Sequence, residues 1–417
     1  MENLISTRKF ESSAVNTFKL SQNPQVFVRG DGPWLFSDND EKYLDLVCGS
    51  ATSNLGHNHP AQIKAIKEAT KTGILHTGTR LISPYRAKLY DILSDYMGTT
   101  DISIHLLNSG AEAIETAIKI TRFVSRKQKF ISFEGGYHGR TLGALSLTHA
   151  EEIRSPFIGN TGDFVTFAPY PRDETEVQYC LEKCSEIFEY SKSVGDPIAG
   201  VVVEAIQGVS GVWGPFPTFL KGIQDLTKLN DALFITDEIW SGLGRSGKKF
   251  AFHFSDVAPD LIILGKGLSS SIPLSAVIAK GDLLKKWPPG AHTSTFQGNP
   301  IACAVACATL REIENSKLIE HVSNSIALCF GKLKDDLISN DFVKDVRFVG
   351  AQCAIEFNNS VTANEVQKLA LSQAKLLTYG GGRKGECVLL LPPINIDENT
   401  LQNALTSLLE IISQGLP

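Results

Sequence analysis

The sequence lacks the features of several protein classes. It has no C-x-x-C pair, and no histidine lies near a cysteine at the spacing of a zinc site, so we expect no metal centre. No apolar run approaches the ~18 residues of a membrane span, and charges occur at 2–11 where a signal peptide needs an apolar core. It contains no basic run with interleaved aromatics, and its formal net charge is -5. These absences predict a cytoplasmic protein that binds neither nucleic acid nor membranes.

The composition is that of a folded globular protein. Of the 417 residues, 42% are hydrophobic and 20% are charged, which allows one large domain and a smaller one. We predict a large domain at 51–300, and a small domain in which the N-terminal segment 1–50 joins the C-terminal part 301–417. Cys180 and Cys184, like Cys303 and Cys307, are four residues apart. On helices this spacing indicates one shared, buried face, which suits a reducing compartment.

The order of the hydrophobic patterns predicts an α/β fold. Residues 26–45 alternate short apolar strands with turn residues, as an antiparallel meander does. Apolar residues at helical spacing follow in four segments, and short β-rich runs occur in four others separated by helical segments. The alternation predicts a mainly parallel sheet covered by helices. The helical segments are 60–70, 84–96, 108–122 and 299–314, and the β-rich runs are 129–133, 200–204, 232–236 and 261–264.

Two of these apolar runs end in charged residues. Lys266 follows the run 261–264 between two glycines, and Asp237 follows the run 232–236. Open α/β sheets place ligand chemistry at the carboxyl ends of their strands. A half-desolvated lysine there is a candidate amine nucleophile or Schiff-base partner, although a lone lysine is more often a solvated loop residue. An aromatic aldehyde cofactor uses both groups, because the lysine forms an imine and the carboxylate keeps the ring nitrogen protonated.

Two loops add to this pattern. The segment Asn108-Ser-Gly-Ala-Glu begins a helix, where exposed N–H groups and the helix dipole bind phosphate, although it also fits an ordinary serine cap. The segment Phe133-Glu-Gly-Gly-Tyr-His-Gly-Arg-Thr follows a strand and presents Tyr137, His138 and Arg140. The aromatic ring could cover a flat heterocycle and Arg140 could bind a carboxylate, whereas the alternative is a surface loop with incidental side chains.

The motifs, in this order, resemble the class III (omega) aminotransferases, a family of fold-type I pyridoxal-phosphate enzymes. The similarity runs from Leu55-Gly-His-Asn-His-Pro to Leu391-Pro-Pro. It implies a pyridoxal 5'-phosphate cofactor and the ping-pong transfer of an amino group from an amine or amino acid donor to a keto acid or aldehyde acceptor. It also implies these roles: Ser109, Gly110 and Ala111 hold the phosphate, Tyr137 stacks on the ring, Asp237 pairs with the ring nitrogen, Ile239 packs on the other ring face, Lys266 carries the Schiff base, Glu204 lies near the substrate, and Thr295 reaches the phosphate of the neighbouring subunit in a homodimer.

The sequence departs from the family at the expected substrate site. Many members hold a substrate α-carboxylate with an arginine just before the Pro-Pro pair, and a glutamate after a Gln-Gly pair closes against that arginine. The aligned residues here are Leu389 and Val209, so both partners are apolar, which predicts an atypical substrate. Arg140 remains as a carboxylate site, and Trp240 stands where some relatives have a glutamine near the cofactor.

Two other functions remain open from the sequence. Racemases and aminomutases share this fold and these cofactor residues, and they need no second acid substrate. A cofactor-binding regulator without turnover is disfavoured because no DNA-binding segment is attached. The glycine-rich stretch 242–247 matches G-x-G-x-x-G and nearly fits a P-loop. Lys249 replaces the Ser or Thr that a P-loop needs for magnesium, and the residues after it are no obvious helix start, so we expect no nucleotide binding there.

Overall fold

A mixed sheet forms the centre of the computed structural model, which describes residues 2–15, 17–21, 23–160 and 163–414. The outermost residues of the two predicted small-domain segments, 1 and 415–417, lie outside this range. Within the described residues the sheet has seven strands in the order β4-β10-β9-β8-β7-β5-β6. The strands are β4 (Ile102–Leu107), β5 (Lys129–Phe133), β6 (Val165–Ala168), β7 (Ile198–Val203), β8 (Leu233–Asp237), β9 (Leu261–Leu264) and β10 (Ser275–Lys280).

Most strand pairs in this sheet are parallel, as the sequence predicts. β6, β5, β7, β8 and β9 run parallel, whereas β10 is antiparallel to both β9 and β4. Successive strand residues face opposite cores: Phe234 and Ile262 belong to one hydrophobic cluster, and Ile235 and Ile263 to the other. The predicted runs at β5, β7, β8 and β9 are confirmed, while β4, β6 and β10 were not anticipated.

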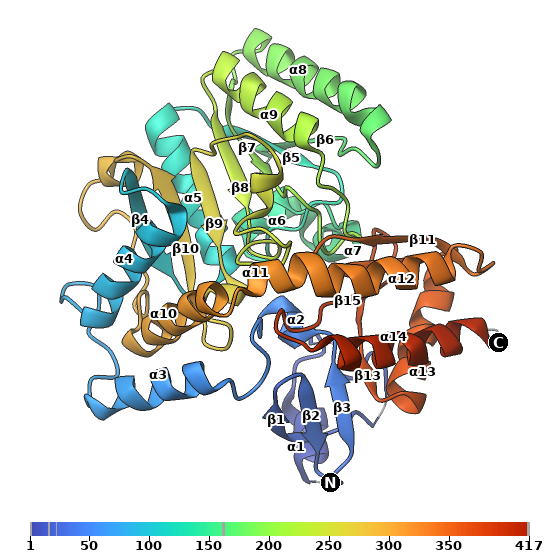
Figure 1. Cartoon of the computed structure of the whole chain (residues 1–417). Helices are drawn as coiled ribbons and strands as arrows, with labels where there is room; N and C mark the ends of the chain where they lie inside the picture. Colours follow the sequence, from blue (N-terminus) through green and yellow to red (C-terminus); the bar gives the residue numbers. More distant parts are fainter. Residues whose placement is uncertain (1, 16, 22, 161–162, 415–417) are drawn as a thin grey trace.

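Helices cover both faces of the sheet, with α5 on one side and α8 and α9 on the other (Figure 1). The four predicted helical segments correspond to α3, α4, α5 and α10. The helices are α1 (Glu2–Phe10), α2 (Cys48–Ala51), α3 (Pro60–Lys71), α4 (Pro84–Met97), α5 (Gly110–Ser125), α6 (Leu142–Leu147), α7 (Glu151–Arg154), α8 (Val177–Ser193), α9 (Pro217–Leu229), α10 (Pro300–Asn315), α11 (Leu318–His321), α12 (Ala327–Leu337), α13 (Ser360–Gln373) and α14 (Glu398–Ser413).

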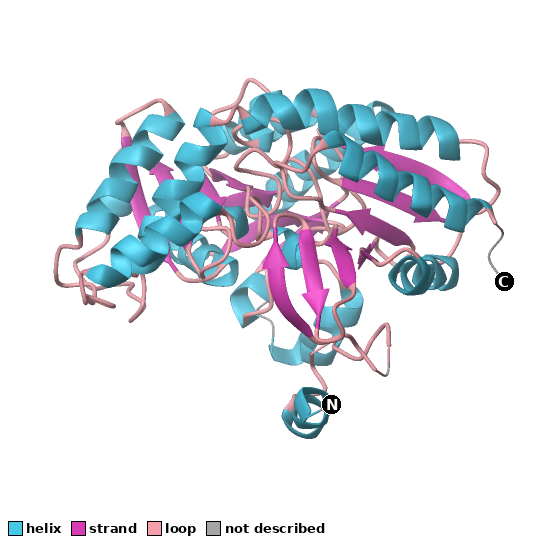
Figure 2. Cartoon of the chain, turned by 60° about the horizontal axis from the view of Figure 1, so that its bottom comes forward, coloured by secondary structure: helices cyan, strands magenta, loops and turns pink. Residues whose placement is uncertain are grey.

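Two smaller sheets contain the N-terminal and C-terminal strands, and Figure 2 brings the first of them to the front. The predicted meander is confirmed, and β13 adds to it in parallel, so that strands from both ends of the chain share one sheet. The sheets are β1 (Phe27–Asp31), β2 (Trp34–Ser37), β3 (Lys42–Asp45) and β13 (Leu376–Leu377), and then β11 (Val343–Phe348), β12 (Cys353–Phe357), β15 (Cys387–Leu390) and β14 (Tyr379–Gly381). The domain boundaries themselves stay a prediction.

The cysteines lie as their spacing predicts. All eight cysteines are free and buried, and the two predicted pairs lie on α8 and α10. Among the described helices, none is both long and apolar enough to cross a membrane.

The glycine-rich loop 242–247 holds distant parts of the chain together. The Arg245 side chain is fully buried. Its Nη1 donates hydrogen bonds to the carbonyls of Ala351 (2.9 Å) and Pro392, and its Nη2 donates to Oδ1 of Asn54 (2.7 Å). Burial lowers the pKa of Arg245, and the nearby Cys48 and Asp45 oppose this shift. The loop thus joins the central sheet to the C-terminal part.

We expect Arg245→Ala to destabilise the protein by at least about 2 kcal/mol, because buried carbonyl groups lose their donor. Urea unfolding followed by circular dichroism measures the change. The exposed Arg311 on α10 provides the control, and Arg311→Ala should stay within about 0.5 kcal/mol of the parent. Equal destabilisation by the two variants would contradict this role for the loop.

Candidate active site

Lys266 lies directly beyond the carboxyl end of β9, as predicted. It has a left-handed backbone with φ of 39°, and its side chain is partly buried. The Nζ atom lies 4.1 Å from the centre of the Trp240 ring and has no hydrogen-bond or ion-pair partner among the described residues. Burial lowers the pKa of Lys266 to about 8, although the charges of Asp237 and Glu204 oppose this shift. The structure therefore provides an amine that loses its proton far more readily than a free lysine.

Asp237 ends β8, the strand next to β9, and its side chain is only 4% exposed. One carboxylate oxygen accepts the N–H of Ile239 (3.0 Å), and the other pairs with Nδ1 of His138 (2.7 Å). Burial alone would lower the pKa of His138, but the hydrogen bond to Asp237 and the charges of Asp237 and Glu204 raise it above the ordinary value. His138 therefore positions Asp237, a role that the sequence analysis did not assign.

The start of α5, where the sequence predicts a phosphate cradle or an ordinary serine cap, is capped by Ser109. Ser109 Oγ accepts the N–H of Glu112 (3.2 Å), and the Glu112 side chain accepts the N–H of Ser109 (3.0 Å), which makes a capping box. This leaves the N–H groups of Gly110 and Ala111 without acceptors among the described residues. A Cβ at position 110 would lie 2.8 Å from Cδ1 of Ile239, so a larger residue there would have to displace this side chain.

The loop after β5 carries Tyr137 and Arg140, and it meets Glu204, which directly follows β7. Glu204 is 6% exposed, and it accepts the backbone N–H of Tyr137 (3.0 Å). It forms no ion pair with a described residue, which argues against a purely structural role for this carboxylate as an ion-pair partner. Burial raises the pKa of Glu204 to about 7, and the charge of Asp237 adds to this shift. Arg140 is exposed, and its Nε donates to the hydroxyl of Tyr137 (3.2 Å).

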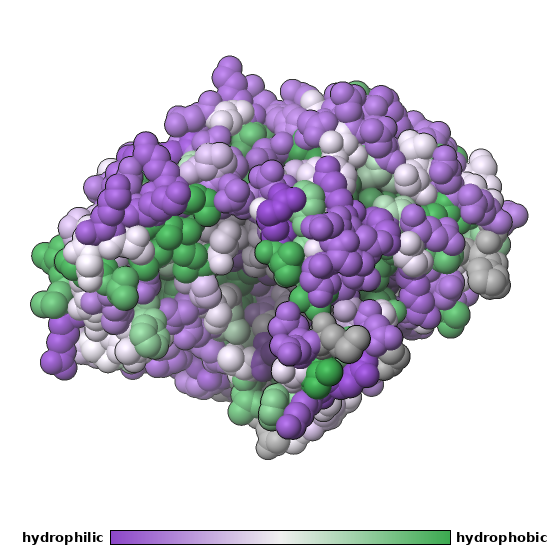
Figure 3. All heavy atoms as spheres, turned by 90° about the horizontal axis from the view of Figure 1, so that it is seen from below, coloured by the Kyte–Doolittle hydropathy of each residue, from purple (hydrophilic) through white to green (hydrophobic). Residues whose placement is uncertain are grey.

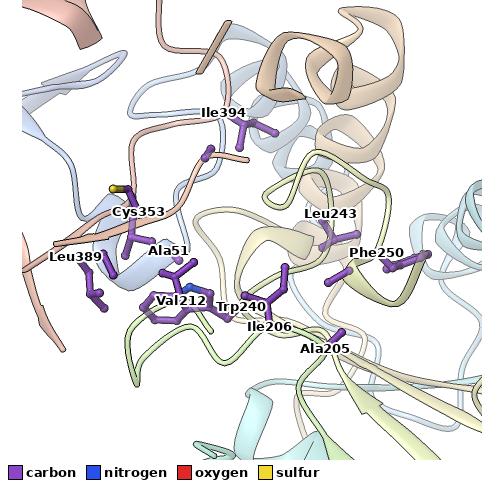
Figure 4. Packing of buried hydrophobic residues seen from close by; sticks show 14 of the residues in the cluster. Ala51, Ala205, Ile206, Val212, Trp240, Leu243, Phe250, Cys353, Leu389 and Ile394 are labelled. Atoms are coloured by element: carbon purple, nitrogen blue, oxygen red, sulfur yellow. The ribbon is translucent and has the colours of Figure 1, made fainter. Parts of the chain in front are cut away.

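The two apolar replacements lie close together in space. Gly381 lies between them, because a Cβ at this position would be 2.5 Å from Cδ1 of Leu389 and 2.6 Å from the carbonyl oxygen of Val209. Leu389 is fully buried in β15. Figure 4 shows its side chain in one hydrophobic group with Ala51, Val212 and Trp240.

Trp240 forms a wall beside Lys266. Its side chain is 7% exposed, and its Nε1 atom is buried without a hydrogen-bond partner. The ring packs edge-on against Tyr379 and against Gly208, where a Cβ would lie 2.4 Å from the indole. The ring therefore occupies the space between Lys266, Tyr379 and Gly208.

Thr295 and Arg383 lie at the edge of the candidate active site. Thr295 is exposed, while the adjacent Ser294 Oγ accepts a hydrogen bond from Asn108 Nδ2 (2.7 Å), next to the phosphate cradle. Arg383 is paired with Glu134 (3.1 Å). The structure thus brings together the residues predicted for the cofactor, with Thr295 facing outward from the same region.

This geometry fits a phosphorylated aromatic aldehyde. The start of α5 offers free N–H donors to a phosphate, Lys266 offers an amine to an aldehyde, and the buried Asp237 carboxylate suits a protonated ring nitrogen. Among common cofactors, only pyridoxal 5'-phosphate carries a phosphate, an aldehyde and a protonatable ring nitrogen on one small ring. The fold and the site together define a pyridoxal-phosphate-dependent enzyme.

The comparison with known proteins gives the family. The family model described as "Aminotransferase class-III" matches residues 18–412, and the chain belongs to this family. It is 34% identical to the acetylornithine aminotransferase of Methanopyrus kandleri over 95% of this chain and 96% of the relative. It is 31% identical to the enzyme of the same name from Aquifex aeolicus, over 93% and 97% of the two chains.

Solved structures support the same fold. An ornithine aminotransferase from Toxoplasma gondii, whose description mentions pyridoxal phosphate at the active site, superposes with a TM-score of 0.87 at 27% identity. That match covers 99% of this chain and 94% of the other. An aminotransferase from Bacillus anthracis gives a TM-score of 0.92 at 25% identity, covering 99% and 98% of the two chains. These findings confirm the predicted class, fold and cofactor, while the roles of single residues stay predictions.

The lowered pKa of Lys266 predicts a pH dependence that needs no turnover. In the apoenzyme, the rate of reductive methylation at position 266 by formaldehyde and cyanoborohydride should rise with pH and level off above about 8, because only the neutral amine reacts. Free N-acetyl-lysine should continue to gain rate up to its ordinary pKa of ~10.4. Quantitative mass spectrometry of the digested protein measures the rate at each pH.

The same experiment tests Asp237. Its charge raises the pKa of Lys266, so Asp237→Asn should move the plateau to lower pH. An unchanged profile in this variant, or a parent profile that follows free lysine, would contradict the electrostatic account of the site.

Proposed function

We propose that this enzyme transfers an amino group from a donor with a terminal amine and a distant carboxylate to a carbonyl acceptor, in a ping-pong cycle. Pyridoxal phosphate supplies the electron-withdrawing ring that stabilises negative charge on the carbon bearing the amine. Lys266 removes a proton from that carbon and returns one at the end of the transfer. With a pKa of about 8, about one tenth of this amine is neutral at pH 7.

Asp237 and His138 support the same chemistry. The Asp237 carboxylate holds a proton on the ring nitrogen, because a buried negative charge stabilises the positive nitrogen. The His138 hydrogen bond fixes the carboxylate in position at the end of β8. Trp240 excludes water from the side of Lys266 on which its ring lies.

The proposal of a donor with a terminal amine rests on the proximity of Val209 and Leu389. An arginine without a partner in this buried place would cost ~3–5 kcal/mol, whereas two apolar residues pack without an unpaired charge. A donor with its amine on the α carbon would put an unpaired carboxylate against these side chains. The names of the relatives support a donor derived from an amino acid, and the apolar pair argues against anchoring its α-carboxylate at position 389.

Arg140 is the proposed carboxylate site for the far end of the donor. It is exposed beside the Tyr137 ring and forms no ion pair with a described residue, so its charge is available to a substrate. Arg383 is less suitable, because a substrate would have to displace Glu134 from it.

Single-turnover absorbance with donor alone tests this proposal. We expect 4-aminobutanoate to convert the cofactor to its amine form with a kcat/KM at least about 10-fold above that of 2-aminobutanoate. Arg140→Gln should lower kcat/KM for 4-aminobutanoate by about 10-fold and leave butylamine, which has no carboxylate, unchanged. Preference for the α-amino acid would contradict the choice of donor. Loss of optical rotation without cofactor conversion would indicate a racemase instead.

We also propose that the enzyme is a homodimer. Exposed hydrophobic residues gather on two segments that touch each other, because the His76 and Phe296 rings are 5.3 Å apart and Asn299 Nδ2 donates to the carbonyl of Leu75. Figure 3 shows hydrophobic side chains on the side where Figure 1 places α3, α4 and α10. Such a surface beside Thr295 supports a partner subunit at the phosphate cradle. The exposed hydrophobic residues are Ile74, Leu75, Leu81, Ile82 and Phe296.

Ile82→Asp should weaken this dimer, because it places a charge in the centre of a buried apolar contact. Ile82 is 87% exposed in the single chain, so the monomer should tolerate the change. Light scattering after size-exclusion chromatography should give twice the chain mass of 45.4 kDa for the parent and a monomer fraction for the variant. Leu229→Asp, at an 81% exposed position on α9, is the matched control and should stay dimeric. A monomeric parent would refute the proposal.

A further inference from the structure

A cavity lies between the central sheet and the C-terminal part, and no role assigned above uses it. Its volume is about 230 Å³. Three basic side chains line it, together with the aromatic rings of Trp213, Phe216 and Phe348, and no acidic side chain is among its lining residues. The basic residues are Arg172, Lys334 and Arg347.

Arg172 carries a charge in this cavity that no described carboxylate pairs with. Its Nη1 atom is buried and has no hydrogen-bond partner. Its guanidinium carbon lies 4.2 Å from the centre of the Trp213 ring. Burial lowers the pKa of Arg172 to about 10, and the neighbouring charges of Arg383 and Arg347 add to this shift, while Glu356 and Glu176 oppose it. A buried donor without an acceptor is costly and indicates a missing partner.

Arg347, by contrast, already has ion-pair and hydrogen-bond partners in the protein. Its Nη1 pairs with Asp345 (2.8 Å) and Glu356 (2.7 Å), and its Nε donates to the carbonyl of Gly211 (2.8 Å). Its guanidinium carbon lies 3.7 Å from the centre of the Trp213 ring. Arg347 therefore brings its own counter-charges and acts as a fixed wall of the cavity.

Lys334 supplies the second unpaired charge. It projects from α12 and forms no ion pair or hydrogen bond with a described residue. With Arg347 neutralised, the cavity holds two uncompensated positive charges, from Arg172 and Lys334. Two such charges match one dianion, and the planar guanidinium can donate two parallel hydrogen bonds to its oxygens.

We propose that this cavity binds a phosphate group, either as inorganic phosphate or on a small metabolite. The volume is below the ~300 Å³ of ordinary ligand pockets, which suits a small oxyanion rather than a large cofactor. The apolar rings around it lower the local dielectric and so strengthen the attraction between the anion and the two cations.

The loop that lines this cavity with Trp213 also contains Val209, which with Leu389 forms the proposed apolar wall of the substrate site. Trp213 and Gln207 exchange backbone hydrogen bonds of 2.9 and 3.2 Å, which close the loop containing Val209. The Trp213 Nε1–H donates to the carbonyl of Ser210 (3.0 Å). An anion that fixes Arg172 over Trp213 therefore also restrains the loop beside Leu389.

Calorimetric titration of the holoenzyme with inorganic phosphate tests the proposal. The holoenzyme is used so that the start of α5 already holds the cofactor phosphate, and the ionic strength is kept constant with chloride. We expect one phosphate per chain. Arg172→Gln should weaken this binding at least ~10-fold and Lys334→Gln ~5-fold, because each removes one unpaired charge.

Lys332→Gln is the matched control, since Lys332 is exposed on the same helix and does not line the cavity. It should bind phosphate like the parent. In the Arg140→Gln variant, which lacks the proposed substrate carboxylate site, succinate should bind more weakly than phosphate. Absence of saturable phosphate binding, or equal weakening by Lys332→Gln, would overturn the site. Tighter binding of succinate than of phosphate by Arg140→Gln, lost on adding Arg172→Gln, would overturn the assignment to phosphate. Lys334→Gln removes only a side chain at the cavity edge, so it keeps the test valid if Arg172→Gln does not fold.

Discussion

The parallel pairing of β8 with β9 is the constraint on which the active site depends. Asp237 pairs with Ile263 in this ladder, and the N–H of Glu238 donates to the carbonyl of Ile263 (2.9 Å). Both strands therefore end at the same edge, where the carboxylate and Lys266 lie together in a poorly hydrated place. Desolvation there outweighs the attraction between the two charges, since the pKa of Lys266 falls to about 8 rather than rising. The position of Lys266 at this edge of the sheet therefore favours its neutral, reactive amine, and no neighbouring base has to remove the proton.

The same sheet explains which parts of the fold could be predicted from the sequence. β7, β8 and β9 are buried on both faces, so they are continuous apolar runs that the sequence reveals. β10 is also buried, but Ser275, Ala276 and Ala279 have low β propensity, and only its pairing with β4 and β9 makes it a strand. Lys266 and Asp237 were predictable because each follows a readable strand. The contact of His138 with Asp237 spans 99 positions, and no local pattern indicates it.

For the apolar pair Val209 and Leu389, the sequence shows which residues are present but not that they lie close together. The identities of Val209 and Leu389 are evident from the sequence, but their closeness depends on Gly381, whose missing side chain lets β14 approach both of them. Leu389 also pairs with Tyr379 across β15 and β14, and Tyr379 packs against Trp240. The apolar wall is therefore continuous from β15 to the ring beside Lys266. Leu389 is fully buried and Val209 is partly buried against the same hydrophobic cluster, so a single charge at either position would lack a partner, which explains why both are apolar together.

The loop 205–216 connects this apolar wall to the basic cavity. A buried carboxylate lies on its active-site side, and two arginines lie on its cavity side. On the side of the active site, buried Glu204 has a pKa near 7, so a small change in local potential alters its protonation. On the other side, Arg172 and Arg347 lie over Trp213, and Arg347 also holds the carbonyl of Gly211. The backbone pair between Gln207 and Trp213 makes the loop short and stiff between these sides. The loop that lines the cavity through Trp213 thus begins next to Glu204, so the two sites share one continuous segment of chain.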